Sequence, residues 1–257
     1  MVNDSGSPLP DDEWQHCERV RVIDTNRRER SVARNTGAAI AMGKYLHFLD
    51  DDDILLPGAL RAFWDLSQAN KAGWLYGFWR TVDNDGNPVN EFRPELNGNI
   101  FALLVSGEGL PLQASLIQAS SFFAVAGFDP AITGVEDRDL GRRLALLGDI
   151  AYAPIVAAQI RIGQVGSTTD WARLAEDDRW GREKALSVGN SFLRARTSAH
   201  NSYWHGRVSR AYFGSTLWNL KHKRLLTATS RAAAGLFFVG GHFVQRGFWQ
   251  GVKEKIQ

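Results

Sequence analysis

Residues 45–60, YLHFLDDDDILLPGAL, constrain the fold of this chain most, because four consecutive aspartates stand between two apolar stretches. Four like charges in a row repel one another, and the flanking apolar residues exclude a solvated acidic tail. Folding alone gives no reason for such a sequence. We therefore expect a short strand that ends at a functional carboxylate cluster, residues 50–53.

A bound cation would resolve the repulsion among these carboxylates. Alternate side chains of an extended chain point to the same side, so Asp50 and Asp52 are predicted to share one ion. Asp51 and Asp53 would point the other way. Hard oxygen ligands suit Mg²⁺ or Mn²⁺, which proteins hold with one or two carboxylates and substrate phosphates, so a nucleotide diphosphate is expected beside it. The alternative is an acidic turn that caps the helix beginning near Pro57.

The order of apolar, helical and turn-forming segments predicts alternating strands and helices, which is typical of a parallel sheet. The expected strands cover residues 20–24, 45–49, 74–82 and 112–117, and the expected helices cover residues 31–42 and 57–69. Asn84, Asp85 and Gly86 predict a hairpin turn into a short returning strand. Residues 94–109 are assigned to helix or loop.

Four motifs together resemble family 2 glycosyltransferases with the GT-A fold. Residues 31–53 contain an Ala-Arg-Asn-x-Gly helix start, an aromatic strand, and the carboxylate cluster in place of the family's Asp-x-Asp motif. Residues 74–89 look like the family's strand pair with its Asp-Gly turn. Residues 125–147 look like its Gly-Phe-Asp and Glu-Asp acceptor segment. The resemblance covers most of residues 1–169.

The resemblance implies an α/β fold with the Rossmann-like mixed sheet of nucleotide-diphospho-sugar transferases in residues 1–169. The chain begins inside what would be the family's second strand, so we expect a catalytic domain truncated at its N-terminus. Asp4 would then match the acidic residue that reads the uracil edge. A turn residue in the sequence Asp-Ser-Gly is the alternative.

Arg34 and Asn35 stand where a helix begins beside the expected cation site. A guanidinium there can pair with a diphosphate, and free backbone N–H groups add donors. With Asp50 and Asp51, these residues are expected to bind the nucleotide sugar. An exposed arginine at a helix start is the alternative, although the helix dipole disfavours it.

Glu136 and Asp137 open a helix whose leucines recur at helical spacing up to Gly148. Acids stabilise the positive end of a helix, which is a sufficient structural reason for them. The resemblance instead implies that Asp137 is the general base of an inverting transfer and that Glu136 holds an acceptor hydroxyl or orients the base. Residues 160–169 depart from the family pattern, because Gly163 stands where histidine is common.

The charge of the chain changes sign near residue 170. Residues 1–169 hold 15 Lys and Arg against 22 Asp and Glu, whereas residues 170–257 hold 15 against 6, so the net charges are −7 and +9. A basic, aromatic-rich helical extension is predicted to attach to an anionic membrane surface, with AAAGLFFVGGHFV as an interfacial helix. A helix pair packed on the catalytic domain is the alternative. The extension lacks a recognised nucleic-acid-binding module, so nucleic acid is not expected as a partner.

The sequence as a whole predicts an inverting glycosyltransferase that uses a nucleotide-diphosphate sugar, with UDP as the expected nucleotide, and a saccharide or lipid-linked acceptor. Cell-surface polysaccharide synthesis at the inner face of the cell membrane is the expected setting, and the single Cys17 fits a reducing cytoplasm. Two alternatives stay open. An aspartyl phosphohydrolase would explain LDDDDIL but lacks its other motifs, and a truncated start would suit an inactive sugar-binding or nucleotide-binding remnant.

Overall fold

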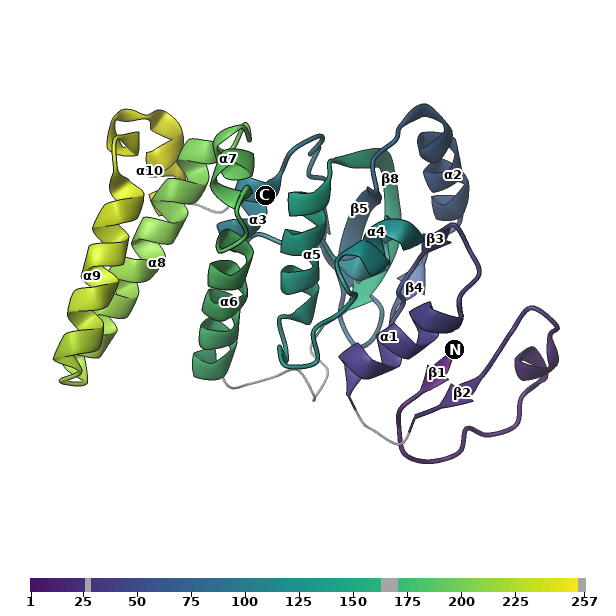
Figure 1. Cartoon of the computed structure of the whole chain (residues 1–257). Coiled ribbons are helices and arrows are strands. Elements are labelled where there is room, and N and C mark those ends of the chain that lie inside the picture. Colours follow the sequence, from purple (N-terminus) through teal and green to yellow (C-terminus); the bar gives the residue numbers. More distant parts are fainter. Residues whose placement is uncertain (26–28, 163–170, 254–257) are drawn as a thin grey trace.

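The computed structural model describes residues 1–25, 29–162 and 171–253 of the 257-residue chain. A mixed β-sheet lies at its centre, with helices on both faces (Figure 1). Helix α2 (Ala59–Ala69) packs on one face, and helices α3 (Phe101–Val105) and α5 (Glu136–Leu147) pack on the other. The chain is therefore an α/β protein, as the resemblance implies.

Within the described residues, the central sheet has six strands in the order β3–β7–β5–β8–β4, with β6 paired to β5. They are β3 (Tyr45–Leu46), β4 (Ile54–Leu55), β5 (Trp74–Val82), β6 (Pro88–Phe92), β7 (Ser115–Gln118) and β8 (Ile150–Arg161). Among these strands, β5 and β8 pair in parallel, and the other described pairs are antiparallel. The sheet is mixed because β5 returns directly through a hairpin into β6 instead of crossing over through a helix.

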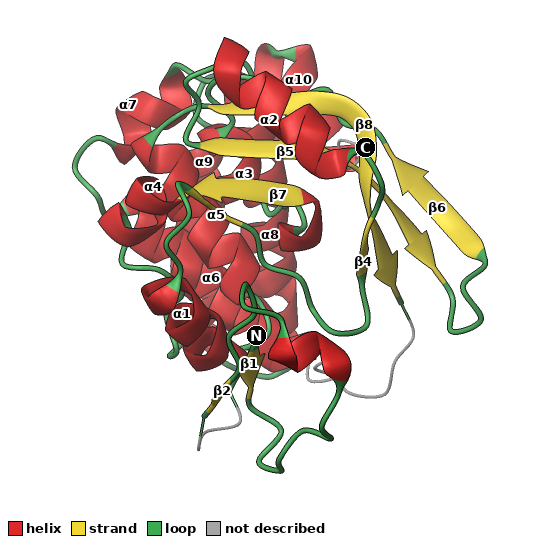
Figure 2. Ribbon diagram, turned by 90° about the vertical axis from the view of Figure 1, so that its right-hand side faces the viewer, coloured by secondary structure: helices red, strands yellow, loops and turns green. Residues whose placement is uncertain are grey.

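Strands β5 and β8 bend along their length, so β6 and β4 pair with their second halves (Figure 2). The register between β5 and β8 shifts around Gly77 and Phe78, and such bulges increase strand twist. A Cβ atom at Gly77 would lie 2.6 Å from the Cβ of Ala157, so glycine is required where the two strands approach.

The predicted helices are confirmed with small shifts of their ends. Helix α1 covers Arg30–Ile40, and α2 and α5 begin and end within two residues of the predicted limits. The hairpin between β5 and β6 is also confirmed, with Gly86 at φ +86°. The segment assigned to helix or loop contains α3, which is buried at all five positions.

The predicted strands are shorter than expected in three places. The segment at 20–24 forms only β2 (Ile23–Asp24), and the segment at 45–49 forms only β3. The start of the segment at 112–117 is a 3₁₀ turn (Leu112–Ala114), which precedes β7. The sheet is nevertheless mixed, as the resemblance implies.

The N-terminal residues form a separate parallel pair, β1 (Val2–Asn3) with β2. Asn3 is buried between the two strands, where its Nδ2 donates to Oδ1 of Asp24 at 2.7 Å. A Cβ atom at Gly37 would lie 3.2 Å from Val2, so β1 packs closely on α1.

The C-terminal part of the described chain is helical. Its elements are α6 (Trp171–Leu186), α7 (Ser191–Arg196), α8 (Asn201–Lys221), α9 (Leu225–Val239), a 3₁₀ turn (His242–Val244) and α10 (Arg246–Lys253). Helices α8 and α9 form an antiparallel hairpin beside α6 (Figure 1). Trp204 and Phe238 of this hairpin share one hydrophobic core with Trp74 and Leu140, so packing is continuous across residue 170 and the domain boundary there stays a prediction from charge.

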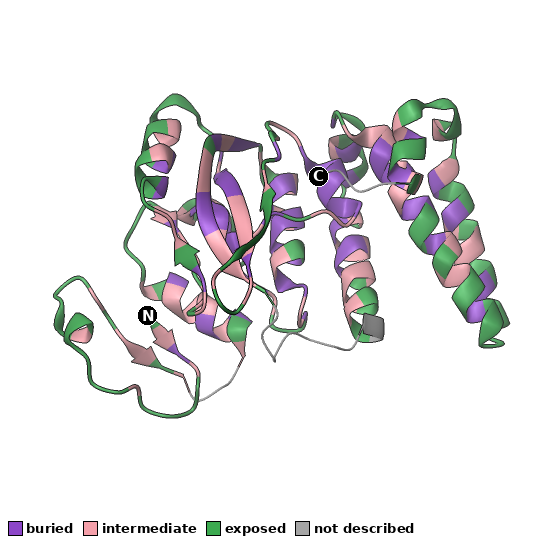
Figure 3. Ribbon diagram, turned by 180° about the vertical axis from the view of Figure 1, so that it is seen from behind, coloured by how far each residue is buried: buried purple, intermediate pink, exposed green. Residues whose placement is uncertain are grey.

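The apolar segment AAAGLFFVGGHFV does not form one interfacial helix. Helix α9 ends at Val239, and Gly240, at φ +44°, separates it from the following 3₁₀ turn. Phe238 is buried against α8, as the alternative of a packed helix pair predicts, whereas the outer faces of the hairpin are exposed (Figure 3). No described helix combines the length and the apolar character needed to cross a bilayer.

Candidate active site

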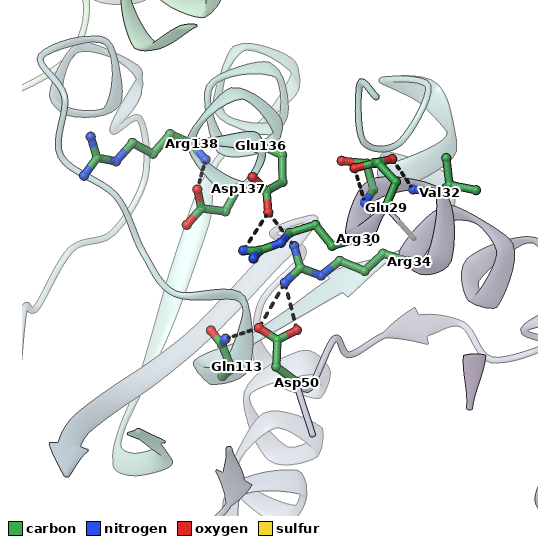
Figure 4. A network of polar contacts seen from close by, with 10 residues as sticks. Glu29, Arg30, Val32, Arg34, Asp50, Gln113, Glu136, Asp137 and Arg138 are labelled. Carbon is green, nitrogen blue, oxygen red and sulfur yellow. Dashed lines mark hydrogen bonds and ion pairs between the residues drawn. The ribbon is translucent and has the colours of Figure 1, made fainter. Parts of the chain in front are cut away.

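Helix α1 begins beside the site and carries two arginines on one face. Glu29 caps it, because its two carboxylate oxygens accept from the backbone N–H groups of Ser31 and Val32, each at 2.9 Å. A carboxylate also suits the positive end of a helix. Arg30 and Arg34 are one turn apart, so both side chains extend toward the same neighbours (Figure 4).

Arg34 connects the aspartate cluster to α5 (Figure 4). Its Nη2 donates to the two oxygens of Asp50 at 2.8 and 3.0 Å, and its Nη1 donates to Oε1 of Glu136 at 3.1 Å. Burial lowers the pKa of this guanidinium, but Asp50 and Glu136 raise it by more, so the pKa of Arg34 lies above its ordinary value. A permanent positive charge is thus fixed between the two predicted motifs.

The four aspartates form a turn rather than the end of an extended strand. The N–H of Asp53 donates to the backbone oxygen of Asp50 at 3.2 Å, and strand β3 has already ended at Leu46. The alternation that predicts Asp50 and Asp52 on one side therefore does not apply. Asp51 is exposed and Asp52 is half-buried.

Two of the aspartates have protein partners. Gln113 donates to Oδ2 of Asp50 at 3.0 Å, and Oδ1 of Asp53 accepts from the backbone N–H of Arg161 at 2.8 Å. Burial raises the pKa of Asp53 to about 6, and the charges of Asp52 and Asp50 add to the rise while the Arg161 N–H opposes it. Asp53 is therefore buried and held by the backbone of β8, whereas Asp50 is held by the side chains of Arg34 and Gln113.

These residues fit a cation held jointly by protein and substrate. In the described part of the chain, no three His, Cys, Asp or Glu side chains meet in a group that could hold a metal by themselves. Mg²⁺, however, is usually bound through one or two carboxylates and substrate phosphates. The cluster has a surplus of negative charge. Arg34 neutralises Asp50, whereas Asp51 and Asp52 add two further carboxylates.

Glu136 and Asp137 occupy the first turn of α5, as predicted. Glu136 is 3% exposed, and its Oε1 also lies 3.4 Å from Nη1 of Arg30. Its other oxygen, Oε2, is buried with no hydrogen-bond partner among the described residues. Burial, followed by the charge of Glu136, raises the pKa of Asp137, although Arg138 and Arg34 oppose the rise. A carboxylate with a raised pKa is suited to accept a proton.

The side-chain amide of Asn35, predicted to bind the nucleotide sugar, is already bonded to the protein backbone. Its Nδ2 donates to the backbone oxygen of Phe128 and its Oδ1 accepts from the Phe128 N–H, both at 2.9 Å. The preceding Gly127 has φ +64°, and a Cβ atom there would lie 2.6 Å from Oδ1 of Asn35. Asn35 therefore fixes α1 to the loop that leads into α5.

Asp4 is half-buried after β1, and no hydrogen bond or ion pair joins it to the Arg34 group within the described residues. Gly163 and the rest of residues 163–170 lie outside the described residues. The structure therefore brings together Arg34, Asp50 and Glu136 by direct contact, with Asp137 beside them.

Two residues of this site are absent from the sequence prediction. Arg30 stands four residues before Arg34, and that helical spacing is a signal that could have identified it. Gln113 offers no such signal, because it contacts Asp50 from 63 positions further along the chain.

The fold matches solved structures of S. aureus TarS. The structure of a TarS fragment in complex with UDP-GlcNAc is 11% identical, with a TM-score of 0.54 over 87% of this chain and 76% of that chain. A second TarS structure, also 11% identical, gives a TM-score of 0.52 over 90% of this chain and 47% of that chain. Likeness at this identity shows the fold alone, and that fold is of the GT-A type.

Sequence comparison gives a family match over part of the chain. Residues 4–109 match the model of Glycosyl transferase family 2, a segment that makes up less than half of the chain. An uncharacterized glycosyltransferase of Methanocaldococcus jannaschii is 34% identical over 86 residues, which cover 32% of this chain and 30% of that protein. A second, from Rickettsia conorii, is 24% identical over 162 residues, or 59% of this chain and 27% of that protein. The chain thus spans less than a third of the length of these curated relatives.

Proposed function

We propose that this chain is an inverting glycosyltransferase that moves a sugar from a nucleoside diphosphate, UDP, to a saccharide or lipid-linked acceptor. The observation that carries the proposal is the position of Arg34, whose one guanidinium contacts Asp50 at 2.8 Å and Glu136 at 3.1 Å. The aspartate cluster at residues 50–53 and the Glu-Asp acceptor segment therefore lie within reach of a single side chain. A reaction between two bound substrates needs such closeness.

On the donor side, Arg34 would exchange its contacts with Asp50 for oxygens of the diphosphate, whose geometry suits a guanidinium. Its raised pKa keeps it positive at every working pH. Asp4 would contact the base. Asn35 would support the donor site by holding α1 in place rather than by contacting the nucleotide.

Asp50 and Asp52 would hold Mg²⁺ or Mn²⁺, which when bound supplies positive charge to the departing diphosphate. Asp51, exposed beside them, would contact the donor.

On the acceptor side, Asp137 would act as the general base. The acceptor oxygen forms a bond to the anomeric carbon as the bond from that carbon to the diphosphate oxygen breaks, and the hydroxyl proton passes to Asp137. The buried Oε2 of Glu136, which has no partner in the described structure, would accept a hydrogen bond from an acceptor hydroxyl. One displacement from the face opposite the leaving group inverts the anomeric centre.

The setting we propose is cell-surface polysaccharide synthesis, with the protein bound peripherally at the inner face of the cell membrane. The net charge of +9 in residues 170–257 supports attraction to anionic lipid.

The test is isothermal calorimetry of the whole chain with UDP, with and without Mn²⁺, followed by a screen of UDP-sugars for release of UDP. We expect UDP to bind and Mn²⁺ to strengthen binding. Phosphatase turnover with a general phosphomonoester and no UDP binding would instead support the aspartyl phosphohydrolase. Binding without turnover of any donor would support an inactive remnant.

A further inference from the structure

The turn between α8 and α9 is an apolar and basic surface far from the core. Residues 217–226, LWNLKHKRLL, form this hairpin tip, and every residue in it except Asn219 is exposed. Its large apolar side chains include Leu226, 88% exposed, and Trp218, 48% exposed. The others are Leu217, Leu220 and Leu225. Contiguous exposed apolar side chains of this size mark an interaction surface.

The hairpin tip belongs to a strongly basic part of the chain. Residues 184–253 contain eleven Lys and Arg and no Asp or Glu. Several of these cations pair with carboxylates on other elements, as Lys184 does with Asp129. Lys221, Lys223 and Arg224 pair with no acidic side chain in the part of the chain that the structure describes. Their charge is therefore available to an external anion.

The backbone holds one of these cations in a conformation that favours glycine. Lys223 has φ +58°, and it ends α8 through the bonds Lys223 N–H to Leu220 O at 3.0 Å and Arg224 N–H to Asn219 O at 2.9 Å. Glycine is the usual residue at this position of a helix end. A lysine in its place presents an ammonium group at the outermost turn.

Trp218 packs between a guanidinium group and an imidazole ring. The Arg224 guanidinium lies 5.2 Å from the centre of its ring, and the His222 ring stacks on it at 4.1 Å. Tryptophan, leucine and basic side chains on one surface are the combination found where proteins meet the headgroups of a bilayer.

The hairpin tip and the candidate active site lie at the same end of the molecule. In Figure 1 the turn between α8 and α9, the first turn of α5 and the start of α1 lie at a similar height in the lower half, above the lowest part of the β1–β2 segment, and Figure 3 shows the same level from behind. A flat surface in contact with the tip would therefore face the end of the molecule that carries Glu136 and Arg34.

We propose that the hairpin tip inserts into the headgroup region of an anionic bilayer and anchors the protein with its active-site end toward the membrane. The apolar side chains supply burial, and Lys221, Lys223 and Arg224 match the charge of anionic lipid. The inference of lipid binding depends only on the exposed side chains of residues 217–226. Delivery of a lipid-linked acceptor to Asp137 rests on the proposed function.

The experiment is flotation of the whole chain with vesicles of phosphatidylcholine, with or without phosphatidylglycerol. We expect binding to the anionic vesicles that weakens as salt rises. Lys223→Gly should lower the partition coefficient about fivefold, since a cation near an anionic surface contributes about that factor, while relieving the left-handed backbone. The double variant Leu225→Ser, Leu226→Ser should lower it roughly tenfold or more.

Lys253→Gln is the matched control, because it removes an exposed cation of the same extension at its other end and should change binding little. Equal binding by Lys223→Gly and the unmodified chain, or no binding of the unmodified chain to anionic vesicles, would overturn the proposal. A dimer that forms without lipid and is lost in the leucine variant would also overturn it, since a second copy would then cover the tip. Calorimetry with UDP on the same samples reports the donor site separately.

Discussion

Removal of Arg34 is the most informative perturbation of the site. Arg34→Met keeps the length of the side chain but leaves Asp50 with Gln113 and leaves Glu136 with Arg30, whose Nη1 is 3.4 Å away. The lost contact to Asp50, 37% exposed, is worth up to about 1 kcal/mol. Glu136 is 3% exposed, and leaving a buried carboxylate with one weak partner costs about 2 kcal/mol more, below the full cost of an unpaired charge.

The expected loss for Arg34→Met is thus about 3 kcal/mol, which in a chain of this size corresponds to a melting temperature lower by about 6–12 °C. Scanning calorimetry or thermal circular dichroism measures it. Arg61→Met is the matched control, since Arg61 donates to Asp65 at 2.9 Å on the surface with 80% of its side chain exposed, and little change is expected.

A double variant tests whether the loss comes from the buried charge of Glu136. Arg34→Met combined with Glu136→Gln should recover much of the stability, because the buried carboxylate that lost its partner is then neutral. Arg34 does not hold Glu136 in the way its 3.1 Å contact indicates if the Arg34→Met variant and the unmodified chain have the same melting temperature. The same follows if the stability losses of the two substitutions are simply additive.

Three further predictions concern the reaction and the scaffold. Asp137→Asn should keep UDP binding by calorimetry and lower turnover by roughly 10²–10⁴, the usual contribution of a general base, and unchanged turnover would remove it from the mechanism. Because burial raises the pKa of Asp137 and the base acts when ionised, turnover should fall as pH drops through that raised pKa and level off above it. A pH–rate profile that stays flat on the acid side would contradict this. Asn35→Ala should lower the free energy of unfolding in urea by about 2 kcal/mol, because two backbone groups of Phe128 lose their hydrogen-bond partner. An unchanged urea midpoint would show that Asn35 does not hold α1 to the loop before α5.

The sequence predicts the helices of this fold well because their signals are local. The spacing of leucines and the acids of the first turn identify α5, and Gly148 follows its last residue. Strand β8 (Ile150–Arg161) receives no prediction, since its alanines and Pro154 give weak strand signals and its pairing with β5 is set by the whole sheet.

The candidate site is predicted only in part, because some of its residues belong to local motifs and others meet only in the folded chain. Arg34, Asp50 and Glu136 belong to motifs that the sequence displays, and the structure brings them into contact. The shape of the aspartate cluster depends on one backbone bond that closes a turn, which alternation cannot predict. The partner of Asn35 is a backbone group 93 residues away, so no local pattern reveals its role.

The single core that Trp204 and Phe238 share with Trp74 has a mechanical consequence. A force applied to the C-terminal helices, for example when a bound surface moves, passes directly through packed side chains into the layer beneath the sheet. The C-terminal helices and the sheet should then deform and melt together, so the two parts move as one rigid body.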